Sequence, residues 1–258
     1  MPGVDERVAL VRRPSRRMAD GIVTHVERQQ VDAELALEQH AGYVAALADA
    51  GWSIREVARA DDLPDSAFVE DTVVMCDELA VLARPGAAER RAEVEGTEEA
   101  LRALGLEIAR IEEPGTLDGG DVLRVGATIY VGRGARTNGE GVRQLRAHAA
   151  PRGLGVVPVP LREVLHLKSA VTALPDGTII CADPSLLDPS AFATMRPVPE
   201  EGGSHVVLLG DGAVLMAASA PRSAALFDDW GFDVVAVDIG EYEKMEGCVT
   251  CLSVLIGS

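Results

Sequence analysis

The stretch VLRVGATIYVGRG at residues 122–134 joins two short apolar runs through Gly126, and the chain contains three similar stretches. These are VVMCDELAVLARP from residue 73, VTALPDGTIICADP from 171 and VVLLGDGAVLMAAS from 206. Their turns hold Asp, Glu or Gly, several of which tolerate tight hairpin geometry. Each stretch therefore predicts a β-hairpin, and the recurrence predicts a repeat architecture.

Three of the hairpins are followed by a helical pattern and then by another apolar strand. After the first hairpin, Val94, Leu101 and Leu104 share one helix face, and LEIARI follows from residue 106. The same order recurs before GVVPVP from residue 155 and DVVAVDI from residue 233. The repeated unit is thus β-β-α-β. SLLDPSAFATM, after the hairpin at 171, could be helical, but no third strand is evident beyond it.

The two ends of the chain supply the parts of one more unit. A helix through Leu35, Val44 and Leu47 lies between RVALV from residue 7 and WSIREVA from residue 52, which leaves one strand missing. CLSVLI from residue 251 is the natural candidate for it. We therefore predict a single domain over residues 1–258, an α/β propeller of five ββαβ units with pseudo-fivefold symmetry, closed without exposed sheet edges. The pattern alone also permits an ordinary α/β sandwich.

The amino-acid composition limits which binding partners and which cellular compartment we expect for the protein. The formal net charge of −17 argues against nucleic acid and anionic membranes and favours a small cationic molecule, although acidic surface can also simply maintain solubility. Four cysteines in 258 residues are too few for a disulfide scaffold, and no segment reaches the roughly 18 apolar residues of a membrane span. We expect a cytoplasmic protein.

Reactive side chains stand just before the first strand of each expected unit. In a closed ring these positions face one end of the central axis. A thiol, an imidazole and paired carboxylates in one cleft are suited to nucleophilic attack on a positively charged carbon. A guanidinium is the expected substrate group, because its N–H donors match carboxylates in pairs. The residues concerned are Glu70, Asp71, Asp118, Asp121, His166, His205 and Cys251.

Cys248 and Cys251 form a C-x-x-C pair near the end of the chain, which raises two alternatives to a single nucleophile. A structural zinc site needs four ligands, and no second C-x-x-C is present. A redox pair favours the start of a helix, whereas CVTCLSVLI is apolar and β-branched and predicts a strand. We therefore expect no metal site and a packing role for Cys248. Zinc is expected only as an inhibitor bound by Cys251 and His166.

Six motifs, in the same order along the chain, resemble those of the dimethylarginine dimethylaminohydrolase family. They are FVEDTVV from residue 68, RPGAAERRAEV from 84, TLDGGDVL from 116, GRGARTN from 132, HLKSAV from 166 and GCVTCLSVLI from 247. The resemblance implies the five-bladed α/β propeller of the guanidino-group modifying (pentein) superfamily. It also implies hydrolysis of Nω,Nω-dimethylarginine and Nω-monomethylarginine to citrulline through a covalent S-alkylthiouronium on cysteine.

The resemblance also implies individual roles. Cys251 would be the nucleophile, His166 the general acid and base, and Asp118 would orient the guanidinium or the histidine. Acidic side chains would bind the guanidinium, two arginines the α-carboxylate, and backbone groups near two apolar residues would complete the pocket. The implied substrate-binding set is Val23, Asp65, Glu70, Asp71, Arg90, Arg136 and Met245. No cofactor is implied, and a monomer or homodimer is expected.

Three other functions remain open at the level of sequence. Arginine deiminases use similar residue types, but they are longer and carry an inserted helical domain for which this chain has no room, so free arginine is the second candidate substrate. A non-catalytic binding protein can also use a five-unit propeller, but it need not keep Cys251, His166 and Asp118 together. The third alternative is a zinc-dependent hydrolase.

Overall fold

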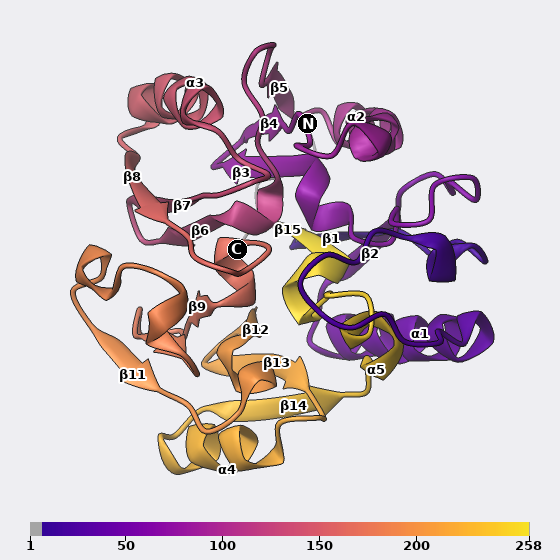
Figure 1. Ribbon diagram of the computed structural model, residues 1–258, viewed down its shortest axis with the longest axis vertical. Helices are drawn as coiled ribbons and strands as arrows, with labels where there is room; N and C mark the ends of the chain where they lie inside the picture. The colour runs from indigo at the N-terminus through magenta and orange to yellow at the C-terminus, as the bar shows by residue number, and fades with distance from the viewer. Residues whose placement is uncertain (1–6, 258) are drawn as a thin grey trace.

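The computed structural model describes residues 7–257, so the ends of the predicted domain, residues 1–6 and 258, lie outside the described residues. Within that range, fifteen strands form five three-stranded sheets. In each sheet the middle strand pairs antiparallel with one neighbour and parallel with the other. Figure 1 shows the helices α1, α2, α3 and α4 at the rim, with β9, β12 and β15 near the centre.

The strands follow the predicted units closely. The first sheet contains β1 (Val8–Val11), β2 (Ser53–Glu56) and β15 (Ser253–Ile256). The second contains β3 (Val73–Cys76), β4 (Leu79–Leu82) and β5 (Glu107–Arg110), and the third β6 (Val122–Val125), β7 (Thr128–Arg133) and β8 (Gly155–Pro160). The fourth contains β9 (Val171–Ala173), β10 (Ile179–Cys181) and β11 (Met195–Pro197), and the fifth β12 (Val206–Gly210), β13 (Ala213–Ala217) and β14 (Asp233–Val237).

Helices connect the strands and precede them. The α-helices are α1 (Ala33–Asp49), α2 (Val94–Ala103), α3 (Gly139–Ala149), α4 (Pro221–Asp229) and the short α5 (Gly240–Glu243). Five 3₁₀ helices stand directly before the first strands of the five units: η2 (Val69–Thr72), η4 (Gly119–Asp121), η6 (Leu167–Ser169), η9 (Glu201–Ser204) and η10 (Val249–Leu252). The others are η1 (Met18–Asp20), η3 (Ala88–Glu93), η5 (Ala150–Arg152), η7 (Pro184–Leu186) and η8 (Pro189–Ala191).

The hairpin turns use the residues that the sequence pattern singled out. Asp77 and Asp211 have φ of 53°, and Gly126 and Gly177 have φ of 58° and 83°. Positive φ is accessible to glycine without cost and is tolerated by aspartate better than by most other residues. These local preferences place the turns and thereby set the register of each hairpin.

The chain closes into a ring through its two ends. Strand β1 runs parallel to β2 and antiparallel to β15, so that Leu10 lies opposite both Arg55 and Val254. The last strand thus completes the sheet that the first strand begins (Figure 1). The five-bladed α/β propeller is confirmed, and the ordinary sandwich is excluded because each unit forms a separate sheet.

The fourth unit contains the strand that was not evident in the sequence. Its third strand, β11, pairs in parallel with β10, with Met195 opposite Ile179. The segment between them forms η7 and η8 rather than an α-helix. Asp183 and Asp188 cap these helices, and each begins with a proline. Pro189 disfavours helical backbone at Asp188, so η7 cannot continue into η8 and the possible α-helix is not formed.

The predicted strand around the C-x-x-C pair is also corrected. Cys248 caps η10, Cys251 lies within it, and the strand begins only at Ser253. The Cys251 amide donates to the Cys248 carbonyl at 3.1 Å, which closes a helical turn before the apolar strand starts. The β-branched composition of CVTC therefore did not determine its backbone, because tertiary context overrides strand propensity.

Apolar side chains pack between neighbouring units and beneath the outer helices. One such cluster joins Leu47 of α1 to Val207 and Leu215 of the fifth sheet and to Leu252 of η10. Within residues 7–257, no helix has the length and apolar character needed to cross a membrane. The packing fixes the inner ends of the sheets, where the 3₁₀ helices place their polar side chains.

Candidate active site

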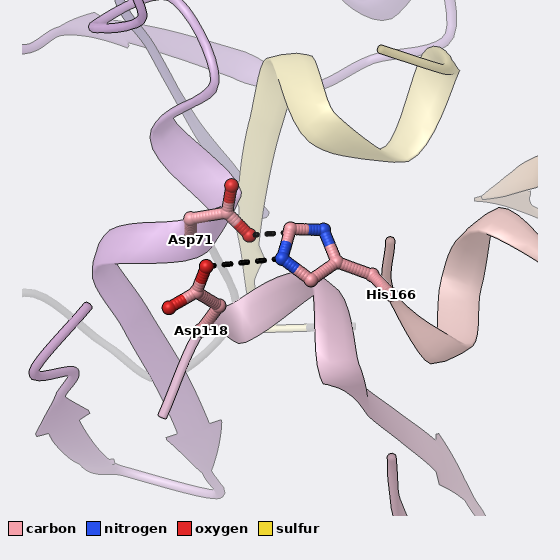
Figure 2. A group of neighbouring side chains, drawn as sticks. All are labelled: Asp71, Asp118 and His166. Atoms are coloured by element: carbon pink, nitrogen blue, oxygen red, sulfur yellow. Dashed lines mark hydrogen bonds and ion pairs between the residues drawn. The ribbon is translucent and has the colours of Figure 1, made fainter. Parts of the chain in front are cut away.

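Four of the 3₁₀ helices that precede first strands bring the candidate catalytic residues together. Helix η2 contacts η4 and η10, and η4 contacts η6. Asp71 lies in η2, Asp118 and His166 cap η4 and η6, and Cys251 lies in η10. The prediction that the residues before the first strands converge is confirmed for these four elements. Figure 2 shows both carboxylates directed at the imidazole ring.

His166 is held between two aspartates. Its Nε2 lies 3.0 Å from Oδ2 of Asp118, and its Nδ1 lies 3.9 Å from Oδ1 of Asp71 (Figure 2). Asp118 is itself fixed, because its Oδ1 accepts a hydrogen bond of 2.8 Å from the Gly86 amide. All three ionisable side chains are buried. The ring orientation is therefore determined by protein groups before any substrate is bound.

The glycines of LDGGD allow this close approach. A Cβ on Gly120 would lie 2.6 Å from His166 Nδ1 and 2.8 Å from Asp71 Oδ1. The Gly120 amide also donates to that same Asp71 oxygen at 2.8 Å. The motif thus supplies a backbone donor where any side chain would displace the imidazole. A tight turn alone does not explain the residue, because Gly120 is not among the residues with positive φ.

A buried arginine holds Asp71 from the other side. Arg90 Nη1 donates to Asp71 Oδ2 at 2.6 Å, and its Nε and Nη2 bond Glu93 at 3.1 and 2.8 Å. Nη2 also lies within hydrogen-bonding distance of the Phe68 carbonyl at 3.3 Å. Most donors of Arg90 are therefore used by protein groups. The sequence prediction missed Glu93 as the partner of Arg90. The only sequence signal for this ion pair is that Glu93 follows Arg90 by one turn in η3.

These charges determine the protonation of the histidine. Burial alone would lower the pKa of His166, but the charge of Asp71 and the hydrogen bond to Asp118 raise it to about 9. Burial would raise the pKa of Asp71, but the charges of His166 and Arg90 outweigh it and hold the pKa below its ordinary value. At neutral pH the site therefore contains an imidazolium flanked by ionised carboxylate.

Cys251 lies beside this group with its thiol in contact with Cys248. The Cys248 amide donates to Cys251 Sγ at 3.4 Å, and the two sulfurs are 3.5 Å apart. The hydrogen bond with Cys248, burial and the charges of Glu70 and Asp71 raise the pKa of the Cys251 thiol above its ordinary value. The thiol proton thus remains on Cys251 in the absence of substrate.

A pocket connects these groups to other predicted residues. Met245 lines the pocket, as does Asp65, whose carboxylate accepts the Ile22 amide at 3.1 Å. Arg136 also lines it, with Nη1 3.7 Å from Asp118 Oδ2. The lining residues are Ile22, Asp65, Phe68, Asp71, Arg90, Arg136, Leu165, His166, Met245, Glu246, Gly247 and Cys251.

Two predicted substrate ligands lie elsewhere. Val23 is not part of this lining and packs against the core cluster around α1, whereas its neighbour Ile22 faces the pocket. Glu70 directs its carboxylate away from Asp71, to Lys168 Nζ at 2.5 Å and Thr250 Oγ1 at 3.0 Å. These three residues line a separate and larger cavity of about 730 Å³. Neighbouring residues of a 3₁₀ helix point in different directions, which separates Glu70 from Asp71.

Glu246 has a role that the sequence pattern did not indicate, whereas His205, which was expected at the mouth of the ring, lies outside the pocket lining. Glu246 has φ of 63° and accepts hydrogen bonds from the amides of Thr24 at 2.7 Å and Val26 at 2.9 Å. It thereby fastens the loop after Ile22 to the pocket rim. His205, by contrast, bonds the Ser169 carbonyl at 2.9 Å and does not line the pocket.

The carboxylates and the imidazole of this site are also groups that can bind a metal ion. Among the described residues, Asp71, Asp118 and His166 present ligand atoms within 4.8 Å of one another. Two of these carboxylates already accept hydrogen bonds from Arg90, Gly120 and Gly86. Cys251 is not part of this three-residue set.

Comparisons with known proteins give one consistent assignment. No family model matches the chain. An N(G),N(G)-dimethylarginine dimethylaminohydrolase of Streptomyces coelicolor is 62% identical over 246 residues, covering 95% of each chain. The dimethylarginine dimethylaminohydrolase of Pseudomonas aeruginosa has been solved as a cysteine-to-serine mutant complexed with citrulline. It superposes on this chain with a TM-score of 0.91 at 34% sequence identity, and the match covers 98% of this chain and 100% of that one. The N-terminal domain of a cyanobacterial arginine dihydrolase, at 19% identity and a TM-score of 0.87 over 98% of both chains, shares the fold.

Proposed function

The chain belongs to the dimethylarginine dimethylaminohydrolase family, and from this premise we propose that its pocket hydrolyses Nω-methylated arginines to citrulline and a methylamine. The observation that carries the proposal is the imidazolium of His166, held by Asp118 and Asp71, in the same pocket as the Cys251 thiol. A nucleophile and a general acid in one cleft are the components required to displace an amine from a guanidinium carbon.

The acidic side chains bind the guanidinium. Asp65 and Asp71 line the pocket, and each carboxylate oxygen keeps acceptor capacity beyond its protein hydrogen bonds. Carboxylates opposite the N–H donors of a guanidinium form charge-assisted hydrogen bonds and localise its charge. Glu70 does not contact the guanidinium directly, because its carboxylate is bound to Lys168 and Thr250. The small substrate is therefore cationic at its side chain.

Cys251 attacks the guanidinium carbon and His166 protonates the departing amine. Nε2 of His166 is bound to Asp118, so Nδ1 is the nitrogen that exchanges a proton with the substrate. The neutral histidine then takes a proton from water, the resulting hydroxide attacks the carbon of the covalent S-alkylthiouronium, and the C–S bond breaks to release citrulline. The hydrogen bond to Cys248 and burial raise the pKa of Cys251, so the thiolate forms only when the positive substrate is bound and the thiol proton has passed to solvent. Alkylation of Cys251 by iodoacetamide that is already complete at neutral pH without ligand would contradict this step.

The two arginines differ in their roles. Arg136 makes one long ion pair, at 3.7 Å, among the described residues, so its guanidinium is the better ligand for the substrate α-carboxylate. Arg90 is occupied by Glu93 and Asp71 and positions Asp71 while it lines the pocket. Backbone groups of Ile22 and Met245 complete the pocket, with Ile22 taking the place predicted for Val23.

We further propose that the reaction needs no cofactor and that the chain acts as a single cytoplasmic domain, as a monomer or homodimer, without nucleic-acid or membrane partners. The chemistry supports this, because the nucleophile, the acid and the cation-binding carboxylates are all side chains of the one chain. The net charge of −17 is consistent with a cationic substrate.

The test is citrulline release from asymmetric dimethylarginine, monomethylarginine and free arginine, each with and without a metal chelator. We expect preferred turnover of the methylated substrates, unchanged by the chelator. Cys251→Ser should abolish it, and Cys181→Ala, which alters a buried thiol in β10, should not.

Preferred turnover of free arginine would instead support an arginine-hydrolysing activity of the same site. Binding of methylated arginines without citrulline release would support a non-catalytic binding protein. Loss of activity on chelation would support a metal-dependent hydrolase. Each of these outcomes would overturn the proposed reaction while leaving the fold unchanged.

A further inference from the structure

The C-x-x-C pair at the end of the chain has a geometry that the proposed mechanism does not use. Cys248 and Cys251 are the N-cap and third residue of η10, and the turn between them is closed by the Cys251 amide donating to the Cys248 carbonyl at 3.1 Å. Such a turn keeps the two Cα atoms within about 7 Å, the range in which a disulfide can form. The sulfurs are already 3.5 Å apart, so they must approach by about 1.5 Å to reach the bonded distance of about 2.05 Å.

The surroundings of the pair distinguish it from the other thiols. Cys251 lines the substrate pocket, whereas Cys76 and Cys181 are buried within strands β3 and β10 of two other sheets. Cys248 is not part of the pocket lining, and its sulfur lies 3.5 Å from Cys251 Sγ and 3.3 Å from the Thr250 hydroxyl. A small oxidant that enters the pocket therefore reaches Cys251 first, and Cys248 is the thiol that stands next to it.

We propose that Cys248 is a resolving cysteine, which forms a reversible disulfide with Cys251 when the pocket is exposed to a hydroperoxide. This inference rests on the proposed role of Cys251 as nucleophile, since the disulfide would remove that nucleophile. It gives Cys248 a role other than the packing role expected from the sequence.

The chemistry balances with hydrogen peroxide as the oxidant. The Cys251 sulfur attacks one peroxide oxygen, the O–O bond breaks, and a sulfenic acid and water are formed, because the thiol proton leaves with the departing hydroxide. The Cys248 thiol then attacks the sulfenic sulfur, the S–O bond breaks, and the oxygen leaves as water with the thiol proton. Two thiols lose two electrons in total, and the peroxide gains them. A dithiol reductant reverses the reaction by thiol–disulfide exchange.

The short distance between the two sulfurs favours the second step, because Cys248 Sγ lies 3.5 Å from Cys251 Sγ before any oxidant arrives. In the reduced pair, the hydrogen bond from the Cys251 thiol also lowers the pKa of Cys248 below its ordinary value, against the effect of burial. Without Cys248, the sulfenic acid on Cys251 has no neighbouring thiol and is exposed to further oxidation, which is irreversible by dithiols.

The experiment compares the full-length protein with Cys248→Ala and, as a matched control, Cys181→Ala. Each protein is treated with hydrogen peroxide, digested without reduction and analysed by mass spectrometry, and its citrulline release is measured before and after dithiothreitol. We expect the starting protein and Cys181→Ala to lose most of their citrulline release with peroxide and to regain it with dithiothreitol. Both should yield a peptide that contains Cys248 and Cys251 and is two hydrogens lighter than the reduced peptide.

Cys248→Ala is expected to lose activity as well, but to yield the sulfinic acid of Cys251 and to recover little. Sulfinic acid on Cys251 in the starting protein, with no linked peptide, would overturn the inference. The linked peptide is observed by mass, so it reports on the disulfide even if the protein releases no citrulline. Failure of the proposed reaction and failure of the disulfide are therefore separable.

Discussion

Replacing Asp118 with asparagine removes one charge from beside His166 and leaves the shape of the site nearly unchanged. The asparagine Oδ1 can still accept the Gly86 amide, which now donates to Asp118 Oδ1 at 2.8 Å. The amide NH₂ then faces His166 Nε2, where Asp118 Oδ2 lies at 3.0 Å. An NH₂ group donates, so it can bond Nε2 only when that nitrogen carries no proton. The substitution therefore favours the neutral imidazole.

The magnitude follows from the lost interaction. A hydrogen bond between charged partners contributes about 1.5–3 kcal/mol, and one pKa unit corresponds to about 1.4 kcal/mol. The pKa of His166, now raised to about 9 by Asp71 and Asp118, should fall by about one to two units in Asp118→Asn. Asp71 remains 3.9 Å from Nδ1, which limits the fall.

The assay is an NMR titration of protein labelled on its histidine rings, with the His166 signal assigned from His166→Gln. Asp121→Asn is the matched control, because Asp121 bonds Thr137 and the Leu167 amide rather than the imidazole. We expect a smaller decrease in that variant, together with an alkaline limb of the activity profile that moves down with the His166 pKa in Asp118→Asn. An unchanged His166 titration in Asp118→Asn, or a larger decrease in Asp121→Asn, would refute the reasoning.

Four further outcomes are expected. Gly120→Ala should abolish citrulline release, because its Cβ would lie 2.6 Å from His166 Nδ1. Gly42→Ala, whose Cβ would have no neighbour within 4 Å, should keep activity and raise the unfolding free energy by about 0.5–1 kcal/mol. Equal activity of the two variants would contradict this. Glu70→Gln leaves Lys168 without its partly buried charged partner and should lower the unfolding free energy in urea by about 1.5–3 kcal/mol. A change below about 0.5 kcal/mol would argue against a stabilising role for that pair. Because the pKa of His166 is raised from 6.5 to about 9, its contribution to stability is full below pH 6.5 and is lost as pH rises through 9, so the urea midpoint should fall between pH 7 and 9. As a single domain, the protein should unfold in one calorimetric transition, and two resolved transitions would argue for separate domains.

Much of the fold could be predicted because its signals are local. Asp77 and Gly126 mark turns whose positive φ few other residues adopt, and short apolar runs on either side mark the strands. The recurrence of that pattern also located the polar residues before the first strands. Asp118 and His166 were therefore identified as catalytic candidates from their places in the repeat, and the structure places them 3.0 Å apart.

The remaining features depend on contacts between units that no local pattern encodes. Strand β11 is only three residues long and exists because β10 offers it a parallel partner. The directions of neighbouring side chains, such as those of Glu70 and Asp71, also depend on contacts with other units.

Local backbone preference and hydrophobic spacing fix the order of the units, the turns and the residue types at the inner end of each sheet, so these features could be predicted along the chain. The packing of the units against one another fixes which atoms face each other. It directed Glu70 to Lys168 and Asp71 to His166, and it folded the C-x-x-C segment into a turn that places two sulfurs 3.5 Å apart. The physical reason is that a side chain's partner is fixed by the packing of elements distant in sequence, where burial requires every charge to find its counter-charge.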